Sequence, residues 1–435
     1  MSKPNATNGK TRKILFGVLA IALAVVCFFC GFFVYSLTLD SEIRSLMRLK
    51  DTIQAEYYEE ITDEQFYSAV FAGVNDNLLD PYSKYMTADE FAQTQSEAAG
   101  NRSGIGIVFL IENEKGDAQM LITRVCGNSP AESAGLKAGE YVVGFGKTKS
   151  SMQASVVFDE FSAFLEGLQT GETFYARVQS GENVRDVALA KKEYVENYVF
   201  YRTSTTAYRF TGNNATTLIE RGEPLPLLPE NTAYIRLTQF NGSAAEEFEK
   251  TMDLFKEQGK TNLVLDLREN GGGFLHIMQS ISSYFCKTSN ENRPIVAIAD
   301  YGEKKENYRA DGNYYDEYFG KDSRICVLAD SSTASASEAL MGAMLDYGAI
   351  SYGDICLSKR SGVAKTYGKG IMQTTFPFGL IYSDAVKLTT AKILWGSSQN
   401  CIHGRGIVEE DGTLTVEENY VGDSEINAAI AKLFM

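Results

Sequence analysis

A stretch near residue 330 places five hydroxyl side chains directly before an apolar run. It reads "DSSTASASEALMGAMLDYG", from Asp330 to Gly348. Ser and Thr hydroxyls accept hydrogen bonds from the free N–H groups of a helix's first turn, but one cap needs only one hydroxyl. A serine at a helix N-terminus also lies beside open N–H groups and the positive end of the helix dipole, which favour negative charge. The stretch therefore predicts either a capped helix or a serine nucleophile, and the choice depends on a base.

The segment "SGVAKTYGKGIMQTT" offers two lysines, Lys365 and Lys369, as that base. A lysine acts as a base only when it is neutral, and burial favours this by lowering its pKa from about 10.4. Lys369 lies between Gly368 and Gly370, just before a strand-like run, where apolar surroundings could bury it. Taken alone, such a lysine is more often a solvated turn residue, since short motifs match by chance.

A glycine run follows a strand-like segment in "LDLRENGGG", at Gly271–Gly273. Glycines allow close approach to bare backbone N–H groups, which can stabilise an oxyanion. The alternative is a flexible turn. A phosphate-binding loop is excluded because G-x-x-x-x-G-K-[ST] is absent.

Composition removes several classes of function. The chain has only two histidines, His276 and His403, so a His-rich metal site is excluded and a Ser-His-Asp triad must use one of them. Lys plus Arg total 41 against 56 for Asp plus Glu, and no basic patch lies beyond the N-terminus, which argues against nucleic acid. Of the seven cysteines, Cys27 and Cys30 fall in an apolar run and the other five are scattered, which indicates neither a zinc site nor a disulfide framework. We expect no metal and no cofactor.

The N-terminus predicts a membrane anchor. A basic flank precedes Ile14–Leu39, a run without any charge. As a helix this run would be about 39 Å long at ~1.5 Å per residue, enough to cross a hydrocarbon core of ~30 Å. The basic flank should stay cytoplasmic, which places the rest of the chain outside. A cleaved signal peptide is the alternative, but no small-residue cleavage site closes the run.

The rest of the chain alternates strand and helix patterns from about residue 230, which is typical of an α/β domain with a mostly parallel sheet. A compact unit of short strands and two short helices precedes it. The segment 196–229 has strand-like composition and a Pro-punctuated linker, but no functional interpretation. The predicted parts are a cytoplasmic basic tail (1–13), a transmembrane helix (14–39), an N-terminal helical region (40–96), a second domain (97–193) and an α/β core (194–435).

Four segments together resemble the carboxyl-terminal processing, or tail-specific, proteases. They are "LDLRENGGG", "TASASEALMGAMLDYG", "KTYGKGIMQ" and "KLTTAKILWGSSQNCIHGRGI". Upstream, "LLDPYSKYMTADEF" is similar to the family's helical segment, and "GIGIVF" with "SPAESAGLKAGEYVVGFG" is similar to its PDZ domain. The matches span about residues 45–420 in family order. The resemblance implies an α/β protease core, a PDZ domain at 97–193 and an N-terminal helical segment after one transmembrane helix.

The resemblance also implies site residues. It makes Ser335 the nucleophile, Lys369 the general base and Gln373 a residue that helps to hold the lysine, with Ser337 as the helix cap. The implied oxyanion hole uses the N–H of Ala336 and one from Gly271, Gly272 or Gly273, and the implied peptide-binding loop of the PDZ domain is Gly104, Ile105, Gly106 and Ile107. The serine and lysine are 34 residues apart, more than is usual in the family, and we assign the excess to a loop in "GDICLSKRSGV".

The implied function is that of a single-pass membrane serine endopeptidase with an extracytoplasmic catalytic domain. Its partners would be proteins or peptides with apolar C-terminal tails, and the family suggests a homodimer. Two alternatives stay open: a catalytically inactive PDZ adaptor on a protease-like scaffold, and an esterase using His403. The intact serine, lysine and glycine set opposes the first, and the absence of G-x-S-x-G opposes the second. Both histidines are then expected to be structural or surface residues.

Overall fold

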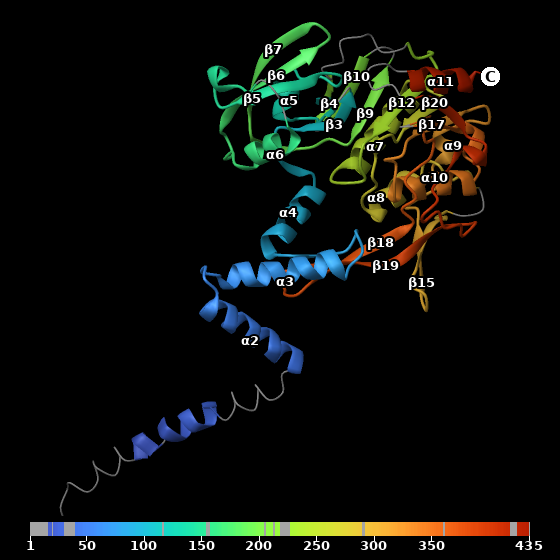
Figure 1. Cartoon of the computed structure of the whole chain (residues 1–435). Coiled ribbons are helices and arrows are strands. Elements are labelled where there is room, and N and C mark those ends of the chain that lie inside the picture. Colours follow the sequence, from blue (N-terminus) through green and yellow to red (C-terminus); the bar gives the residue numbers. More distant parts are fainter. Residues whose placement is uncertain are drawn as a thin grey trace, which may run out of the picture. The chain divides into compact units, whose positions relative to one another are not determined.

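The computed structural model forms two compact units, residues 1–79 and 80–435 (Figure 1). It describes residues 16–19, 21–29, 40–114, 117–153, 157–203, 206–211, 214–217, 227–288, 292–359, 362–417 and 424–434.

The helices α2 (Ser41–Glu56) and α3 (Asp63–Asn77) belong to the first unit. Helix α3 begins with a capping box. The Gln65 N–H donates to the Thr62 hydroxyl at 3.2 Å, and the Thr62 N–H donates to the Gln65 side chain at 2.9 Å. These reciprocal bonds satisfy two donors that the first turn would leave open.

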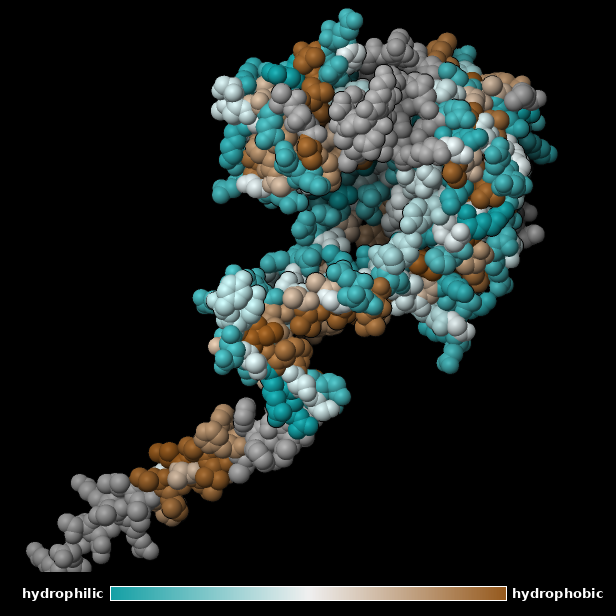
Figure 2. All heavy atoms as spheres, in the orientation of Figure 1, coloured by the Kyte–Doolittle hydropathy of each residue, from teal (hydrophilic) through white to brown (hydrophobic). Residues whose placement is uncertain are grey.

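Residues 16–19 and 21–29 are helical, and Figure 2 shows them as a run of hydrophobic side chains. Within the described part of the chain, no helix is both long and apolar enough to cross a membrane. The predicted basic tail at 1–13, and residues 14, 15, 20 and 30–39 of the predicted anchor, lie outside the described residues.

The second unit begins with β1 (Lys84–Met86) and α4 (Ala88–Ala98), followed by a five-stranded antiparallel sheet in the order β3-β4-β5-β6-β7. Its elements, with the β2–β8 pair beside it, are β2 (Asn101–Gly104), β3 (Ile107–Glu114), β4 (Asp117–Val125), α5 (Pro130–Ser133), β5 (Tyr141–Gly146), η1 (Lys149–Ser151), α6 (Phe158–Glu166), β6 (Thr173–Ser180), β7 (Asn183–Ala190) and β8 (Lys192–Val195). We call the part from β2 to β8 the β2–β8 module. Helices α5 and α6 are the two predicted short helices, and Phe161 of α6 lies in the module's hydrophobic core with Phe145 and Phe174.

The central sheet of this unit has eight strands in the order β11-β10-β9-β12-β13-β16-β17-β20. Their bounds are β9 (Val199–Thr203), β10 (Thr206–Thr211), β11 (Asn214–Thr217), β12 (Thr232–Leu237), β13 (Asn262–Asp266), β16 (Ile325–Ala329), β17 (Ile355–Lys359) and β20 (Leu414–Glu417). The five strands from β12 to β20 run parallel, as predicted, whereas β9, β10 and β11 pair antiparallel. The prediction of a mostly parallel sheet is therefore right for one side of a mixed sheet.

Helices cover both faces of the central sheet. They are α7 (Ala244–Glu257), α8 (Leu275–Ser282), α10 (Ala336–Asp346) and α11 (Ser424–Leu433), with the shorter α9 (Tyr315–Tyr318), η2 (Tyr352–Asp354) and η3 (Glu409–Asp411). Alternate residues of β13 serve the two faces, because successive strand side chains point to opposite sides. Leu263 and Leu265 belong to the core that contains α7, α8 and α10 residues, and Val264 belongs to the core that contains α11 residues.

A second, antiparallel sheet packs against α10. It has the order β1-β19-β14-β15, with β18 also paired to β19, and its remaining bounds are β14 (Ile295–Asp300), β15 (Lys305–Arg309), β18 (Ile371–Pro377) and β19 (Ala385–Trp395). Trp395 lies so close to α10 that a Cβ at Gly342 would come within 2.3 Å of its ring. Since residues Ala336 to Met344 are all buried, α10 lies between the two sheets and its N-terminus is held from both sides.

The predicted loop in "GDICLSKRSGV" is wrong in part. Ile355–Lys359 forms β17, an almost completely buried strand between β16 and β20, and residues 360–361 lie outside the described residues. The segment 196–229, which the sequence left without an interpretation, supplies β9, β10 and β11 at the edge of the central sheet. Its role is therefore at least architectural.

Candidate active site

Ser335 lies where the chain turns from a buried strand into a buried helix. Strand β16 ends at Ala329, and Ser335 is the N-cap residue of α10. Its backbone has φ 59° and ψ −115°, a left-handed conformation that non-glycine residues rarely adopt. Such strain costs on the order of 1–3 kcal/mol and clusters at functional sites. The residue is half-buried, whereas Ala334 and Ala336 on either side are buried, so the serine is the exposed point of the turn.

The prediction that Ser337 caps this helix is wrong. Ser337 lies inside α10, is fully buried, and donates its hydroxyl to the backbone carbonyl of Asn270 at 2.9 Å. It therefore ties the helix to the loop after β13. Of the hydroxyls before the helix, Ser335 is the one at the N-cap position.

Glu338 brings the serine and lysine segments to one carboxylate. Its Oε2 atom accepts the backbone N–H of Ser335 and that of Lys369, both at 2.9 Å. Its Oε1 atom accepts the Gly368 N–H at 2.7 Å and the Thr366 hydroxyl at 2.6 Å. Burial raises the pKa of Glu338, although these four bonds oppose the rise. A fully buried carboxylate thus fixes both predicted catalytic residues through their main chains.

Lys369 precedes β18 and is half-buried. The glycines on either side of the lysine allow another part of the chain to pack closely on it. A Cβ at Gly368 would come within 2.8 Å of the Gly406 nitrogen, and one at Gly370 within 2.8 Å of the His403 nitrogen. The chain at 403–406 therefore closes over this segment. Burial lowers the pKa of Lys369, and the charge of Lys387 lowers it further, against the opposing charges of Asp80 and Glu338. The direction is the one that a general base needs near neutral pH.

The glycine run belongs to a loop that packs on the turn containing Ser335, the predicted nucleophile. We call this turn, between β16 and α10, the nucleophile turn. Asn270 is fully buried and organises this loop: its side chain donates to the Leu237 carbonyl at 2.8 Å and accepts the Gly272 N–H at 2.9 Å, while its carbonyl accepts the Ala334 N–H at 3.0 Å. Gly272 has φ 101°. A Cβ there would lie 2.8 Å from both the Ala334 carbonyl oxygen and the Ser335 Cβ. Only glycine fits at this approach.

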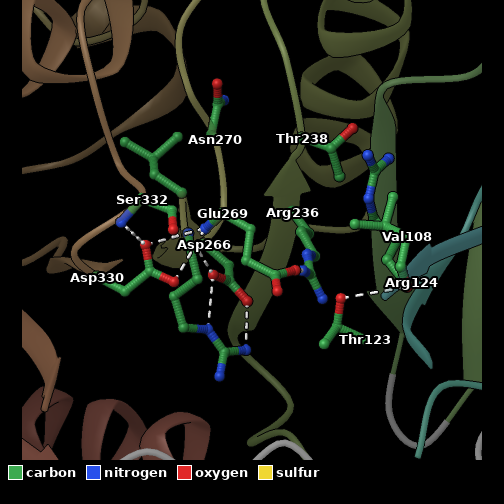
Figure 3. A network of polar contacts seen from close by, with 12 residues as sticks. Val108, Thr123, Arg124, Arg236, Thr238, Asp266, Glu269, Asn270, Asp330 and Ser332 are labelled. Carbon is green, nitrogen blue, oxygen red and sulfur yellow. Dashed lines mark hydrogen bonds and ion pairs between the residues drawn. The ribbon is translucent and has the colours of Figure 1, made fainter. Parts of the chain in front are cut away.

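A network of charged residues also holds the loop after β13, which contains the glycine run (Figure 3). Asp330 accepts the Glu269 N–H at 3.1 Å and the Ser332 N–H at 2.9 Å, which joins the loops after β13 and β16. Asp266, at the end of β13, pairs with Arg268 at 2.6 Å. Burial alone would raise the pKa of Asp266, but the Arg268 charge and hydrogen bonds hold it at about 2. The loop is therefore rigid at the carboxyl ends of the parallel strands, where α/β folds carry their sites.

Three of the four predicted oxyanion donors have an open N–H. Within the described residues, no hydrogen bond involves the backbone N–H of Ala336, Gly271 or Gly273. The Gly272 N–H, by contrast, is used by Asn270. The structure thus gives Gly272 the close approach to Ser335, and leaves the other three as candidate donors.

Gln373 does not contact the lysine by any hydrogen bond among the described residues. It lies on β18, beside an irregularity in the pairing with β19, and its amide donates to the Thr389 hydroxyl at 3.1 Å. Any effect of Gln373 on Lys369 would pass through the β18–β19 hairpin. The two histidines are both exposed, as expected of surface residues.

A groove of about 1160 Å³ lies along the β2–β8 module. All four residues of the predicted peptide-binding loop line it: Gly104, Ile105, Gly106 and Ile107. Its walls continue along β3, through Val108 and Phe109, to Leu165 of α6. Strand β3 pairs with β4 alone and is an edge strand, so its outer backbone groups face the groove.

The packing at Gly272 gives a testable prediction. We expect Gly272→Ala to destabilise the chain by about 1–3 kcal/mol, because the new methyl overlaps the nucleophile turn and strains a left-handed residue. Gly271→Ala is the matched control: a Cβ there meets nothing within 4 Å. Thermal unfolding checks both. Equal melting temperatures for the two variants would contradict the close approach.

Comparisons with known proteins give a family and several relatives that this chain resembles. Residues 231–411 match the model of peptidase family S41, so the chain contains a domain of that family. A probable CtpA-like serine protease of Staphylococcus saprophyticus is 28% identical over 371 residues, or 85% of this chain and 65% of that protein. One of Staphylococcus haemolyticus is 26% identical over 368 residues, or 84% of this chain and 64% of that protein. The chain therefore spans about two thirds of the length of these curated relatives.

A solved structure from Bacteroides fragilis, assigned to the S41 proteases, is similar in fold. The TM-score is 0.54 at 14% identity, and the match covers 86% of this chain and 90% of the other. At this identity the likeness concerns the fold alone.

Several residues of the site escaped sequence analysis. Neither Glu338, inside the stretch that contains the serine, nor Asn270, directly before the glycine run, was singled out there. Thr366 is fully buried and bonds Glu338, yet nothing in its local sequence marks it. The one available signal was the acidic residue three positions after Ser335, which is the capping-box spacing.

Proposed function

We propose that this chain is a serine endopeptidase with Ser335 as nucleophile and Lys369 as general base. The observation that carries the proposal is the single Oε2 atom of Glu338, which accepts the N–H of both residues. The S41 domain and the CtpA-like relatives support the reaction class.

The proposed chemistry follows from the arrangement. Neutral Lys369 accepts the hydroxyl proton of Ser335 as the oxygen attacks a peptide carbonyl. The oxyanion is stabilised by the N–H of Ala336 and one from Gly271 or Gly273. The lysine ammonium then gives its proton to the leaving amine. Water, deprotonated by the same lysine, hydrolyses the acyl-enzyme and releases the serine.

We further propose that the β2–β8 module is a PDZ domain that binds the C-terminal tail of the substrate. Such domains add a peptide strand to a sheet edge and hold its carboxylate on backbone N–H groups. The free edge of β3 beside the groove suits the first requirement, and the glycines of the 104–107 loop suit the second. Apolar lining residues such as Ile107, Phe109 and Leu165 suit a tail ending in apolar residues.

We also propose that residues 14–39 anchor the chain in the cell membrane as a single pass, with the catalytic part outside the cytoplasm. The uncharged run with its basic flank supports this. The expected homodimer stays a prediction.

A peptide-cleavage assay with residues 40–435 tests the peptidase and the tail recognition together. We expect a peptide with a free, apolar C-terminus to be cleaved at least about tenfold more efficiently than its C-terminal amide, because the amide loses the charge-assisted bonds to the loop. The measurement is kcat/KM for the pair. No cleavage of either peptide would contradict the peptidase and favour the inactive adaptor, and equal cleavage would contradict tail recognition only.

The pH dependence of kcat/KM should reflect the pKa of Lys369. Its folded pKa is lowered, so the neutral base accumulates, and kcat/KM rises, as pH increases through a value below the usual 10.5. Replacing Lys387 by Gln removes a positive charge that lowers this pKa, so the rise should move to higher pH. Lys387→Arg keeps the charge and should leave the midpoint near that of the wild type. A midpoint unchanged in Lys387→Gln would contradict this electrostatic contribution.

A further inference from the structure

A tyrosine from the start of the second unit lies against the amine of Lys369. The Nζ atom is 4.9 Å from the centroid of the Tyr82 ring. The Tyr82 hydroxyl is 3.0 Å from that of Tyr367, 285 residues later in the chain and two residues before the lysine. The sequence of this region, "DPYSKY", predicts a turn, and nothing in it points to the distant lysine.

The segment that carries Tyr82 is attached to the sheet that contains the β18–β19 hairpin, which Lys369 precedes. Strand β1, beginning two residues after Tyr82, pairs with β19. The buried Ser83 hydroxyl accepts the Thr389 N–H at 2.9 Å, and the Tyr82 N–H donates to Asp80 at 2.8 Å. The ring is therefore held at both ends, by its backbone and by its hydroxyl.

We propose that Tyr82 is a positioning residue for Lys369. The Tyr82 ring covers one face of the lysine amine and keeps water from it. This inference rests on the proposed role of Lys369 as general base. The hydroxyl bond to Tyr367 fixes the ring in this position, since Tyr367 belongs to the same segment as the lysine.

The ring influences the amine in two opposing ways. An aromatic face attracts the charged amine and so raises the pKa, by about 1–1.5 units when the pair is desolvated. Exclusion of water disfavours the charged amine, and burial is the largest of the causes that lower the pKa of Lys369. Because the ring supplies part of that burial, we expect its removal to raise the pKa of Lys369.

Other charged groups act on the same amine and must stay constant in a test. Lys387 of β19 lowers the pKa of Lys369, whereas Asp80 of the turn and Glu338 of α10 raise it. The Tyr82 hydroxyl is neutral at the relevant pH, because its bond to Tyr367 raises its own pKa to about 12. Substitutions at Tyr82 leave all three charges in place.

The test measures the amine itself. Trace labelling with acetic anhydride at a series of pH values, read by mass spectrometry on the peptide that contains Lys369, gives the midpoint at which the amine becomes neutral. Lys365, in the same segment, serves as an internal reference. The midpoint is used rather than the rate, because a smaller side chain also opens the amine to reagent.

We expect Tyr82→Ala to raise the midpoint by about one unit, which leaves about tenfold less neutral amine at a fixed lower pH. Tyr82→Phe keeps the ring and should shift the midpoint less. Tyr85→Ala is the matched control: Tyr85 lies on the same segment but packs against Phe378 and bonds Asp384, so it should leave the midpoint unchanged if the fold persists by circular dichroism.

An unchanged or lowered midpoint in a folded Tyr82→Ala variant would overturn the proposal, as would an equal shift in Tyr85→Ala. The labelling needs no peptide cleavage. If the chain proves not to be a peptidase, the labelling still decides whether Tyr82 controls the amine. If it is a peptidase, the midpoint of kcat/KM should follow the labelling midpoint across the variants.

Discussion

Ser335→Ala and Lys369→Ala are each expected to reduce peptide cleavage by about 10⁶-fold, the scale on which a serine peptidase responds to loss of its nucleophile or base. In the proposed mechanism the serine oxygen forms the acyl bond, and no other hydroxyl occupies the N-cap of α10. Lys369 is the proposed base, and its backbone N–H shares the Glu338 carboxylate with the N–H of Ser335. Both variants should fold, since neither side chain is fully buried. The measurement is kcat for a fluorogenic peptide, with circular dichroism to confirm folding.

Neighbouring residues of the same kind provide the controls. Ser331→Ala removes a hydroxyl from the same loop, and Lys365→Ala removes a lysine from the same segment, and both should retain near wild-type activity. The double variant Ser335→Ala/Lys369→Ala should be no slower than either single variant, because the two act as one unit. Substantial cleavage by Lys369→Ala would remove the lysine from the mechanism, and would direct attention back to the esterase-like alternative with His403.

Local sequence signals predicted much of the fold. Buried strands such as β13 and β16 appear as short apolar runs, and α7 has a clear helical period that ends before Gly259. The positions of the nucleophile turn and the glycine loop after such strands follow from the same patterns. The glycines beside Lys369 were correctly associated with burial, although the chain that covers them comes from residues 403–406.

Contacts between distant segments could not be predicted in this way. The antiparallel β9–β11 extension has strand-like composition, but its partner β12 is chosen by packing that no local pattern encodes. The long spacing between Ser335 and Lys369 predicts a loop in "GDICLSKRSGV", whereas part of this stretch forms β17. Its burial comes from two neighbouring strands, and Ser358 is satisfied by Glu425 of α11. The contacts of Tyr82 and Glu338 with Lys369 likewise join segments that are distant in the sequence, so no local pattern predicts them.

Glu338→Ala is expected to have the largest effect of any change outside the reacting groups. The substitution leaves three buried backbone N–H groups, those of Ser335, Gly368 and Lys369, and the Thr366 hydroxyl without their acceptor. Each orphaned group costs about 1–3 kcal/mol, less whatever water entering the cavity restores. We expect a loss of about 3–5 kcal/mol in unfolding free energy by urea titration. Because two of these groups belong to the proposed nucleophile and the proposed base, kcat/KM should also fall at least about 10³-fold.

Glu338→Gln should lower the unfolding free energy and kcat/KM less than Glu338→Ala does. The amide can keep its oxygen toward Ser335 and Lys369 and turn its NH₂ toward Thr366 and Gly368, so that only the Gly368 N–H and the Thr366 hydroxyl proton lose their acceptor. Glu247 is the matched control for stability. It is also buried and accepts four hydrogen bonds, from Asn197, Tyr198, Val199 and Ser243, but it holds β9 rather than the nucleophile turn. Glu247→Ala should cost a similar unfolding free energy yet retain most of its kcat/KM below its melting temperature. If both alanine variants lost activity in proportion to stability alone, Glu338 would be a structural residue, and the serine and lysine would owe their positions to something other than its carboxylate.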